Sequence, residues 1–220
     1  MYAFTYHRAQ TIDDAVSLFA KGDDPQLLAG GQTLLPTMKL RLAMPSDLID
    51  VGHLSDLKGI SVDGSAIRVG AGEKHADVAN SAEVQQHIPG LALLAGEIGD
   101  PHVRHMGTLG GSIANNDPSA DYPAACLGLG ATIHTNRQSL LADDFFKDMF
   151  ETVLEPGEII THVTFPIVER SSYAKFPNPA SRYAIVGVFV SLTDGKARLA
   201  VTGAGPVVFR VPDMEAALSR

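Results

Sequence analysis

The sequence contains no tryptophan, one cysteine and no long hydrophobic run. The single cysteine, Cys126, excludes an internal disulfide and any cysteine-rich zinc or iron–sulfur site built from this chain alone. Because it lies in an apolar stretch, we interpret it as a buried, unreactive thiol. A membrane-spanning helix requires about 18 consecutive apolar residues, whereas the apolar runs here are interrupted by glycine or threonine. We therefore expect no membrane insertion.

Basic residues are also few: 17 Lys and Arg stand against 25 Asp and Glu, a formal net charge of −8. Such a chain repels a phosphate backbone, and it has no basic run interleaved with aromatics, so nucleic acid is not expected as a partner. The first residues lack the basic end and apolar block of a secretory signal, and we therefore expect a cytoplasmic protein. A chain of 220 residues with 45% hydrophobic content can form one or two folded domains.

Local sequence patterns predict both helices and strands. Thr11 and Asp14 form a capping box at the start of a helix over 11–21. Asp194 and Gly195 lie between two β-rich runs, a pattern typical of a hairpin turn. The patterns predict further helices over 34–41, 75–88, 89–99 and from 212 onward, and strands over 26–30, 47–51, 66–72, 131–135 and 158–166. The strands in the middle of the chain are expected to form a mixed sheet with helices.

Two glycine pairs interrupt this pattern, Gly30–Gly31 and Gly110–Gly111. Each pair is followed within two positions by a hydroxyl residue, Thr33 or Ser112. Glycine lets backbone N–H groups come within hydrogen-bonding distance of an anion such as pyrophosphate. Neither the G-x-G-x-x-G fingerprint of dinucleotide-binding folds nor a P-loop is present in the sequence. We therefore predict two anion-binding backbone loops of another kind; for either loop taken alone, an ordinary turn is the alternative.

Four blocks carry a resemblance to a known family: "AGGQTLLPTMKLR", "GDPHVRHMGTLGGSIANNDPSADYPAA", "LEPGEIITHVTFP" and "YAKF". In this order and spacing, the sequence from residue 1 to about 210 resembles the FAD-binding medium subunit of molybdenum hydroxylases, the carbon monoxide dehydrogenase and xanthine dehydrogenase family. The resemblance implies an α+β fold: a two-lobed FAD-binding domain of the PCMH and vanillyl-alcohol-oxidase type, followed by the start of a C-terminal α/β domain. The expected units are lobe 1 over 1–55, lobe 2 over 56–168 and an incomplete C-terminal flavoprotein domain over 169–220, so we expect a C-terminal piece to be missing.

The resemblance also implies which residues bind FAD. From the first lobe, the residues that would wrap the FAD pyrophosphate are Ala29, Gly30, Gly31, Gln32, Thr33 and Leu34. From the second lobe, they are Thr108, Gly110, Gly111 and Ser112. The sequence departs from the family at Gln32, where many relatives have His or Ser, and at Asn115–Asn116, where many carbon monoxide dehydrogenases have His-Ala. We expect such changes to alter hydrogen bonding to the phosphates.

Three single residues complete the site that the resemblance implies. Asp121 matches a carboxylate near the ribityl and pyrophosphate region; on its own, it predicts a helix N-cap. Ile160 matches an apolar residue against the flavin or adenine end, and an ordinary core strand residue is the alternative. Lys175 matches a lysine near the flavin ring, where its charge would stabilise the anionic reduced flavin; a solvated lysine at a strand edge is the alternative.

The function implied is that of an oxidoreductase subunit whose cofactor is FAD. It would pass electrons from iron–sulfur clusters of a partner subunit to an external acceptor such as NAD, a quinone or oxygen. The partners would be an iron–sulfur small subunit and a molybdopterin large subunit, because one cysteine cannot ligate a cluster. Two alternatives stay open: a flavin-free scaffold subunit, and a standalone flavin reductase of the same fold. We predict no catalytic residue, because the flavin carries the chemistry, and no metal site, since His102 and His105 lack a third ligand.

Overall fold

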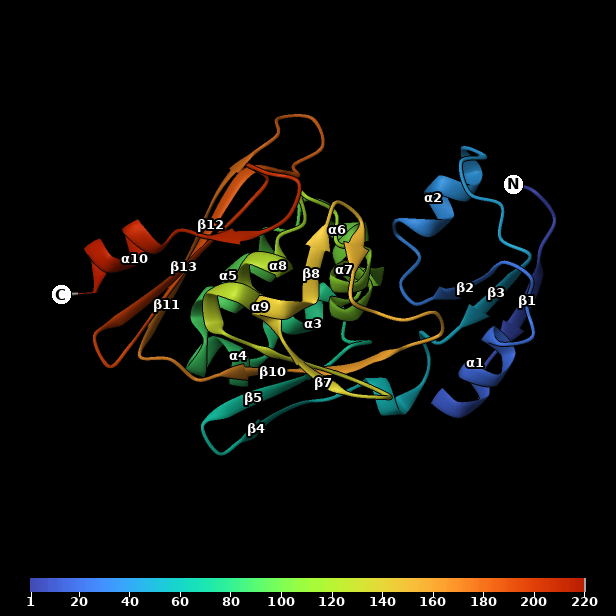
Figure 1. Cartoon of the computed structure of the whole chain (residues 1–220), viewed down its shortest axis with the longest axis horizontal. Helices are drawn as coiled ribbons and strands as arrows, with labels where there is room; N and C mark the ends of the chain where they lie inside the picture. Colours follow the sequence, from blue (N-terminus) through green and yellow to red (C-terminus); the bar gives the residue numbers. More distant parts are fainter. Residues whose placement is uncertain (220) are drawn as a thin grey trace.

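The computed structural model describes residues 1–219, which form an α+β fold with four β-sheets (Figure 1). The first lobe is a three-stranded parallel sheet, in the order β1-β3-β2, with two helices. Its elements are β1 (Thr5–Arg8), α1 (Ile12–Phe19), β2 (Pro25–Leu28), α2 (Leu34–Lys39) and β3 (Asp47–Asp50). The capping box is confirmed, because the Asp14 peptide N–H donates to Thr11 Oγ1 over 3.0 Å. The sequence patterns missed β1, whose four residues are polar or aromatic and mostly exposed.

The second lobe contains a five-stranded sheet, in the order β4-β5-β10-β6-β7, and helices that cover one of its faces. The strands are β4 (Ile60–Asp63), β5 (Ala66–Gly70), β6 (Thr132–Thr135), β7 (Ser139–Leu141) and β10 (Ile160–Pro166). The helices are α3 (His75–Asn80), α4 (Ala82–His87), α5 (Pro89–Gly96), α6 (Pro101–Met106), α7 (Leu109–Asn115), α8 (Tyr122–Leu129) and α9 (Ala142–Phe145). A 3-10 turn, η1 (Ser55–Leu57), leads into this lobe, and β8 (Phe146–Asp148) pairs with β9 (Glu151–Thr152) as a small hairpin.

Two expectations about the second lobe were wrong. The five-stranded sheet is not mixed, because all of its pairings are antiparallel. The expected single helix over 75–88 is two helices, since Ser81 is extended (φ −64°, ψ 125°) between them. The Ser81 side chain instead caps α4 by accepting from the Val84 N–H over 3.3 Å. A serine inside a helical pattern therefore ended one helix and began the next.

The C-terminal part forms a four-stranded antiparallel sheet, in the order β11-β12-β13-β14, and one helix. Its elements are β11 (Arg170–Pro177), β12 (Ala184–Thr193), β13 (Lys196–Thr202), β14 (Phe209–Arg210) and α10 (Pro212–Leu218). The hairpin predicted at Asp194–Gly195 is confirmed: both residues have positive φ, 49° and 71°, as the tight turn between β12 and β13 requires.

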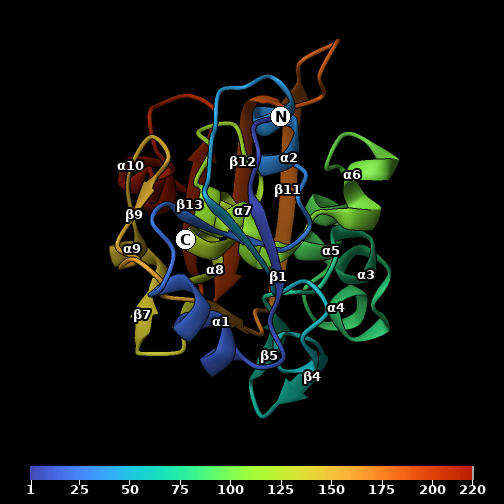
Figure 2. The same ribbon diagram turned by 90° about the vertical axis from the view of Figure 1, so that its right-hand side faces the viewer.

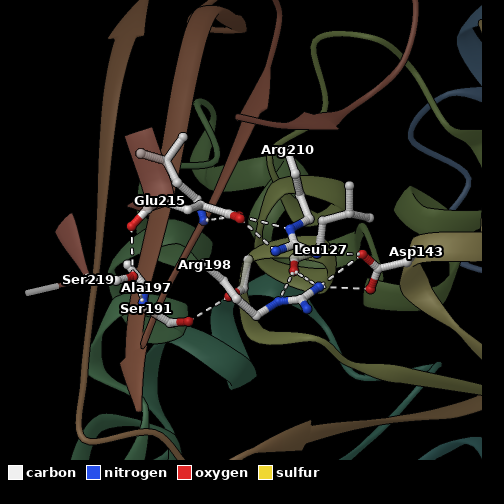
Figure 3. Close-up of polar contacts among 10 residues, drawn as sticks. Leu127, Asp143, Ser191, Ala197, Arg198, Arg210, Glu215 and Ser219 are labelled. Carbon is white, nitrogen blue, oxygen red and sulfur yellow. Dashed lines mark hydrogen bonds and ion pairs between the residues drawn. The ribbon is translucent and has the colours of Figure 1, made fainter. Parts of the chain in front are cut away.

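A polar network fastens α10 to this sheet and to the second lobe (Figure 3). Glu215 accepts from the Leu199 peptide N–H over 2.8 Å and from the Arg210 guanidinium over 2.6 Å. Arg198 in turn donates to Asp143 of the second lobe over 2.7 Å and to the Leu127 carbonyl over 2.9 Å. These contacts join three elements that are distant in sequence, so the C-terminal sheet is held firmly against the second lobe.

Two hydrophobic cores hold the molecule together. The larger core combines the five-stranded sheet, helices α5 and α8 and side chains of the C-terminal sheet such as Phe189. Cys126 is fully buried in it, and burial raises the pKa of its thiol, as expected for an unreactive cysteine. A smaller core lies within the first lobe around Ala15 and Ile49, and also contains Ile159. No helix among residues 1–219 is long and apolar enough to cross a bilayer.

Candidate functional site

The main cavity lies where the first lobe faces the second and has a volume of about 790 Å³. Both glycine loops line it, together with the ends of β10 and β11 and the loop that joins β11 to β12. All the residues that the sequence predicts to bind the cofactor line this cavity: Ala29, Gly30, Gly31, Gln32, Thr33, Leu34, Thr108, Gly110, Gly111, Ser112, Asp121, Ile160 and Lys175. Thirteen residues drawn from distant blocks of sequence are thus brought together.

The glycines are required first by the protein's own backbone. A Cβ atom on Gly30 would overlap the Met106 carbonyl and lie 2.7 Å from Gly107 Cα, so the two loops pack directly on each other. A Cβ atom on Gly110 would lie 2.6 Å from Ala71 Cβ. Gly31 has φ +70°, a conformation that favours glycine. At Gly111, a Cβ atom would meet only the Thr108 hydroxyl, at 2.9 Å, so this glycine, which lines the cavity, can present its bare surface to a ligand.

The first glycine loop offers unused hydrogen-bond donors. Among residues 1–219, no protein atom accepts from the peptide N–H groups of Gly31, Gln32 and Thr33. The Thr33 hydroxyl occupies the N-cap position of α2 without making a capping bond. Gln32 turns its amide back onto the Gly30 carbonyl over 3.1 Å, which steadies the loop. Successive free N–H groups of this kind form a concave site for an anion.

The second glycine loop has already used its backbone donors. The Gly110 N–H donates to the Ala71 carbonyl over 2.7 Å, and the Ser112 N–H donates to the Thr108 carbonyl over 3.0 Å. The Thr108 hydroxyl caps α7 by accepting from the Gly111 N–H over 3.1 Å. Within the described residues, the Ser112 hydroxyl has no protein partner. This loop can therefore contribute the Ser112 hydroxyl and a surface without a side chain at Gly111, but fewer free N–H groups than the sequence suggested.

Asp121, Lys175 and Tyr173 form a buried polar cluster at the cavity wall. The Lys175 ammonium lies 2.9 Å from Asp121 Oδ1, and the two side chains are only 2% and 6% exposed. The Tyr173 hydroxyl donates to Asp121 Oδ1 over 2.5 Å. Burial raises the pKa of Asp121, while Lys175 and Tyr173 oppose that shift. Asp121 does occupy the N-cap position of α8, as its local sequence predicts, but its side chain makes no capping bond.

Lys175 is neither solvated nor isolated. Its ammonium also donates to the Glu97 carbonyl over 3.1 Å, which places β11 against the end of α5. Its charge next to the cavity is therefore balanced by Asp121. Ile160 is 5% exposed and belongs to the large core, as the alternative predicts, and it also lines the cavity; its contact with FAD stays a prediction.

The sequence did not predict several of the residues that line the cavity. Arg182 and Tyr183 reach the cavity from the β11–β12 loop, and Phe150 reaches it from the turn between β8 and β9. The run of Pro, Asn and Ser around residues 177–181 is the available signal for the first pair, since such loops often carry function. His75 also lines the cavity; it is 5% exposed, and burial, followed by the nearby Arg104, lowers its pKa to about 4.

Metal binding finds no support in the part of the chain that the structure describes. No group of three or more His, Cys, Asp or Glu residues gathers there as a ligand set. His102 is exposed beside Asp100, and His105 lies 3.0 Å from the Pro101 carbonyl of its own helix. Both histidines lie on the short helix α6, which precedes the second glycine loop.

The residues present fit FAD. The volume of the cavity is within the usual range for a cofactor site, roughly 300 to 1,000 Å³. Free N–H groups on the first loop suit a pyrophosphate, and the bare surface of Gly111 leaves room beside it. Apolar side chains such as Ile160 and Phe150 suit the two ring systems.

The sequence of residues 2–168 matches the family model described as the FAD binding domain in molybdopterin dehydrogenase. The chain belongs to this family. Its cofactor is accordingly FAD, and it falls in the oxidoreductase class, so both predictions are confirmed. The α+β fold class is confirmed as well by similarity to solved members of the family.

Among curated proteins of this FAD-binding family, the nicotine 6-hydroxylase medium subunit of Paenarthrobacter nicotinovorans is 35% identical over 99% of this chain and 80% of its own length. The carbon monoxide dehydrogenase medium chain of Hydrogenophaga pseudoflava is also 35% identical, over 94% of this chain and 77% of its own. Among solved structures, carbon monoxide dehydrogenase from Hydrogenophaga pseudoflava aligns with a TM-score of 0.91 at 35% identity, covering 97% of this chain and 79% of that one. Quinoline 2-oxidoreductase from Pseudomonas putida 86 aligns with a TM-score of 0.88 at 30% identity, covering 94% of this chain and 76% of that one.

Proposed function

We propose that this chain is the electron-transfer subunit of a molybdenum hydroxylase and works in the cytoplasm. An iron–sulfur small subunit and a molybdopterin large subunit are the proposed partners, and electrons pass from the iron–sulfur clusters through FAD to an external acceptor. The observation that carries the proposal is the single cavity between the lobes, in which all thirteen predicted cofactor-binding residues meet. The named medium subunits and medium chains among its relatives support the subunit role.

The protein's own contribution is to bind and orient the cofactor. FAD, when bound, supplies redox chemistry that no side chain can supply. The first glycine loop would hold the pyrophosphate with the N–H groups of Gly31, Gln32 and Thr33. The second loop would add the Ser112 hydroxyl. These donors are fixed by backbone packing at Gly30, so they need little reorganisation when the anion arrives.

The buried pair of Asp121 and Lys175 would orient the remainder of the cofactor. The Tyr173 hydroxyl and the Lys175 ammonium both bind the carboxylate, which fixes its orientation and leaves about two of its four lone-pair sites for a ligand. The ammonium has used two of its three N–H groups, on Asp121 and on Glu97. One donor is left, and we propose that it serves the flavin end of the cofactor.

The clusters and the molybdenum site would lie on other chains. The only cysteine in the sequence is buried in the large core, so this chain offers no thiolates for a cluster. One buried cysteine is also consistent with a reducing compartment, where disulfides are rare. The substrate would be chosen at the molybdenum subunit and not here.

The experiment that tests the proposal is metal and flavin analysis of the complex purified through a tag on this chain. We expect FAD, iron and molybdenum in constant ratio across the main gel-filtration peak. Rapid mixing of the reduced complex with NAD, a quinone or oxygen would then identify the acceptor. FAD without iron and molybdenum would favour a standalone flavin reductase, and metals without FAD would favour a flavin-free scaffold.

A further inference from the structure

Asn116 and the turn between β8 and β9 are joined by an unusual set of hydrogen bonds. Asn116 follows α7 in the left-handed conformation (φ 44°, ψ 48°) and is 1% exposed. Its Nδ2 donates to the carbonyls of Asp148 and Glu151, each over 2.8 Å. Its own carbonyl accepts from the Phe150 N–H over 3.1 Å. One buried side chain therefore holds both ends of the turn and its tip.

The residue at the tip of this turn is Phe150, an aromatic residue with an unfavourable backbone conformation. Phe150 has φ +56°, which is a strained conformation for a bulky residue. Its side chain is 57% exposed, so burial within the protein does not offset that strain. Strained residues fixed by their surroundings are concentrated at ligand clamps and active sites. Phe150 lines the cavity that binds the cofactor, whereas its neighbour Met149, 53% exposed in the same turn, does not.

The position of the turn selects one end of the cavity. Viewed from the first lobe, β9 lies on one side of α7, and α6 and β11 lie on the other (Figure 2). Lys175 comes from β11, and we have proposed that it serves the flavin end. The first glycine loop, proposed for the pyrophosphate, packs where α6 ends and the chain leads into α7, since the atoms nearest to a Cβ on Gly30 belong to Met106 and Gly107. The adenosine half then extends toward the turn that carries Phe150.

We propose that Phe150 is the aromatic contact for the adenine ring of FAD and that Asn116 is its positioning residue. Every base has a flat π face, and stacking on an aromatic side chain is a general way to bind it. Leu154, two residues beyond β9, adds apolar surface to the cavity lining. The proposal rests on the FAD-binding function of the chain and extends it to Phe150, which no sequence motif marks, and to Asn116, at which the sequence departs from many carbon monoxide dehydrogenases.

The test is the affinity of the purified chain for FAD and for FMN, which lacks the adenosine half, measured by flavin fluorescence. Phe150→Ala is expected to weaken FAD binding about tenfold, the size of one lost stacking contact, and to leave FMN binding unchanged. Phe150→Tyr should keep the wild-type affinity for FAD. Met149→Ala is the matched control, because it removes an equally exposed side chain from the same turn without touching the cavity.

Asn116→Gly tests the positioning role. Glycine keeps the left-handed backbone and the carbonyl acceptor but loses both side-chain bonds to the turn. We expect a loss of FAD affinity close to that of Phe150→Ala, and no further loss when the two changes are combined.

Unchanged FAD affinity in Phe150→Ala would overturn the proposal, and so would equal losses for FAD and FMN. If the wild-type chain bound no FAD at all, the result would contradict the FAD-binding function itself. This outcome concerns the wild-type chain, whereas the adenine contact is overturned by the affinities of Phe150→Ala, so the two results can be told apart. Unfolding of Asn116→Gly would leave the Phe150 series as the deciding measurement.

Discussion

Gly30 of the first lobe packs directly on Gly107 of the second, and a Cβ atom on Gly30 would lie 2.7 Å from Gly107 Cα. The glycine is therefore required by contact between the lobes before any ligand is considered. The distance between the two loops, and with it the width of the cavity, is set by this contact. A side chain here would change the site even where it touches no cofactor.

Gly30→Ala is therefore expected to separate the lobes, because its methyl group would meet the backbone at Met106 and Gly107, which cannot rotate away. We expect FAD affinity to fall by at least about tenfold, as for a misplaced set of hydrogen bonds, together with a lower melting temperature. Gly96→Ala is the matched control, since the nearest atom to its added methyl group is 3.9 Å away. Wild-type FAD binding by Gly30→Ala would contradict this account of the loop contact.

Gly110 and Gly111 are adjacent, yet substitution should affect them differently. Gly110→Ala places its Cβ 2.6 Å from Ala71 Cβ inside the second lobe, so it should mainly lower stability. Gly111→Ala meets only the Thr108 hydroxyl, at 2.9 Å, on the side of the cavity. The Thr108 hydroxyl can shift at the cost of its capping bond to the Gly111 N–H, so the melting temperature should fall less than in Gly110→Ala, while FAD binding weakens. Two measurements on both variants separate these effects: thermal unfolding without FAD, and titration with FAD. A larger loss of FAD affinity in Gly110→Ala and a larger loss of stability in Gly111→Ala would show that Gly110, and not Gly111, faces the ligand.

The Asp121–Lys175 pair should behave as a buried unit. Asp121→Asn leaves the ammonium of Lys175 buried without its carboxylate, and removing one partner of such a pair costs roughly 3 to 5 kcal/mol of unfolding free energy. The double variant Asp121→Asn/Lys175→Met should be more stable than the sum of the single changes. Urea unfolding of the four proteins measures this coupling, with the exposed Lys196→Met as a control for loss of charge alone. Strict additivity would mean that the two groups do not stabilise each other.

His75 should make the fold sensitive to acid. Burial lowers its pKa in the folded protein to about 4, whereas in the unfolded chain it keeps a pKa near 6.5. The unfolded state therefore binds the proton first, and stability is lost as the pH falls from about 6.5 to 4. The loss from this group is about 3 kcal/mol at 1.36 kcal/mol per pKa unit. His75→Gln should flatten the pH dependence of the unfolding free energy in this window.

His162 provides the comparison for the acid prediction. Burial, then His134 and Arg68, lowers its pKa to about 4 as well, but it lies outside the cavity on the five-stranded sheet. His162→Gln should reduce the acid loss without changing FAD affinity. An unchanged acid profile in His75→Gln would show that this histidine does not control stability in that range.

The sequence predicted the parts of the site that depend on short-range signals. Local backbone requirements account for the capping box at Thr11, the turn at Asp194–Gly195 and the two glycine pairs. The structure confirms the capping box and the turn, and it places both glycine pairs at the cavity. Only the expected anion-binding role of the second glycine loop differs. The second glycine loop gives its N–H groups to Ala71 and Thr108, and no local pattern reveals that tertiary choice. Glycine content indicates where the backbone can be approached but not what approaches it.

Long-range contacts account for the remaining differences. Tyr173 reaches Asp121 across 52 positions of sequence, so its part in the cluster could not be inferred from either neighbourhood. Asp121 occupies the predicted N-cap position of α8, but its carboxylate bonds to Lys175 and Tyr173 and not to the first peptide groups of the helix. Local propensity predicts the role of a side chain when only its sequence neighbours contact it. In a buried site, residues that are distant in sequence also contact the side chain, so predictions from local propensity fail there.

The two separate hydrophobic cores have a consequence for how the protein unfolds. The small core belongs mostly to the first lobe, with Leu57 and Ile159 contributed from beyond it, whereas the second lobe and the C-terminal sheet share the large one. A ligand that contacts both glycine loops adds its binding energy to the contact between two otherwise distinct cooperative units. Saturating FAD should therefore merge a two-step denaturation into a single transition, so the cofactor acts as the structural link that makes two folding units melt as one.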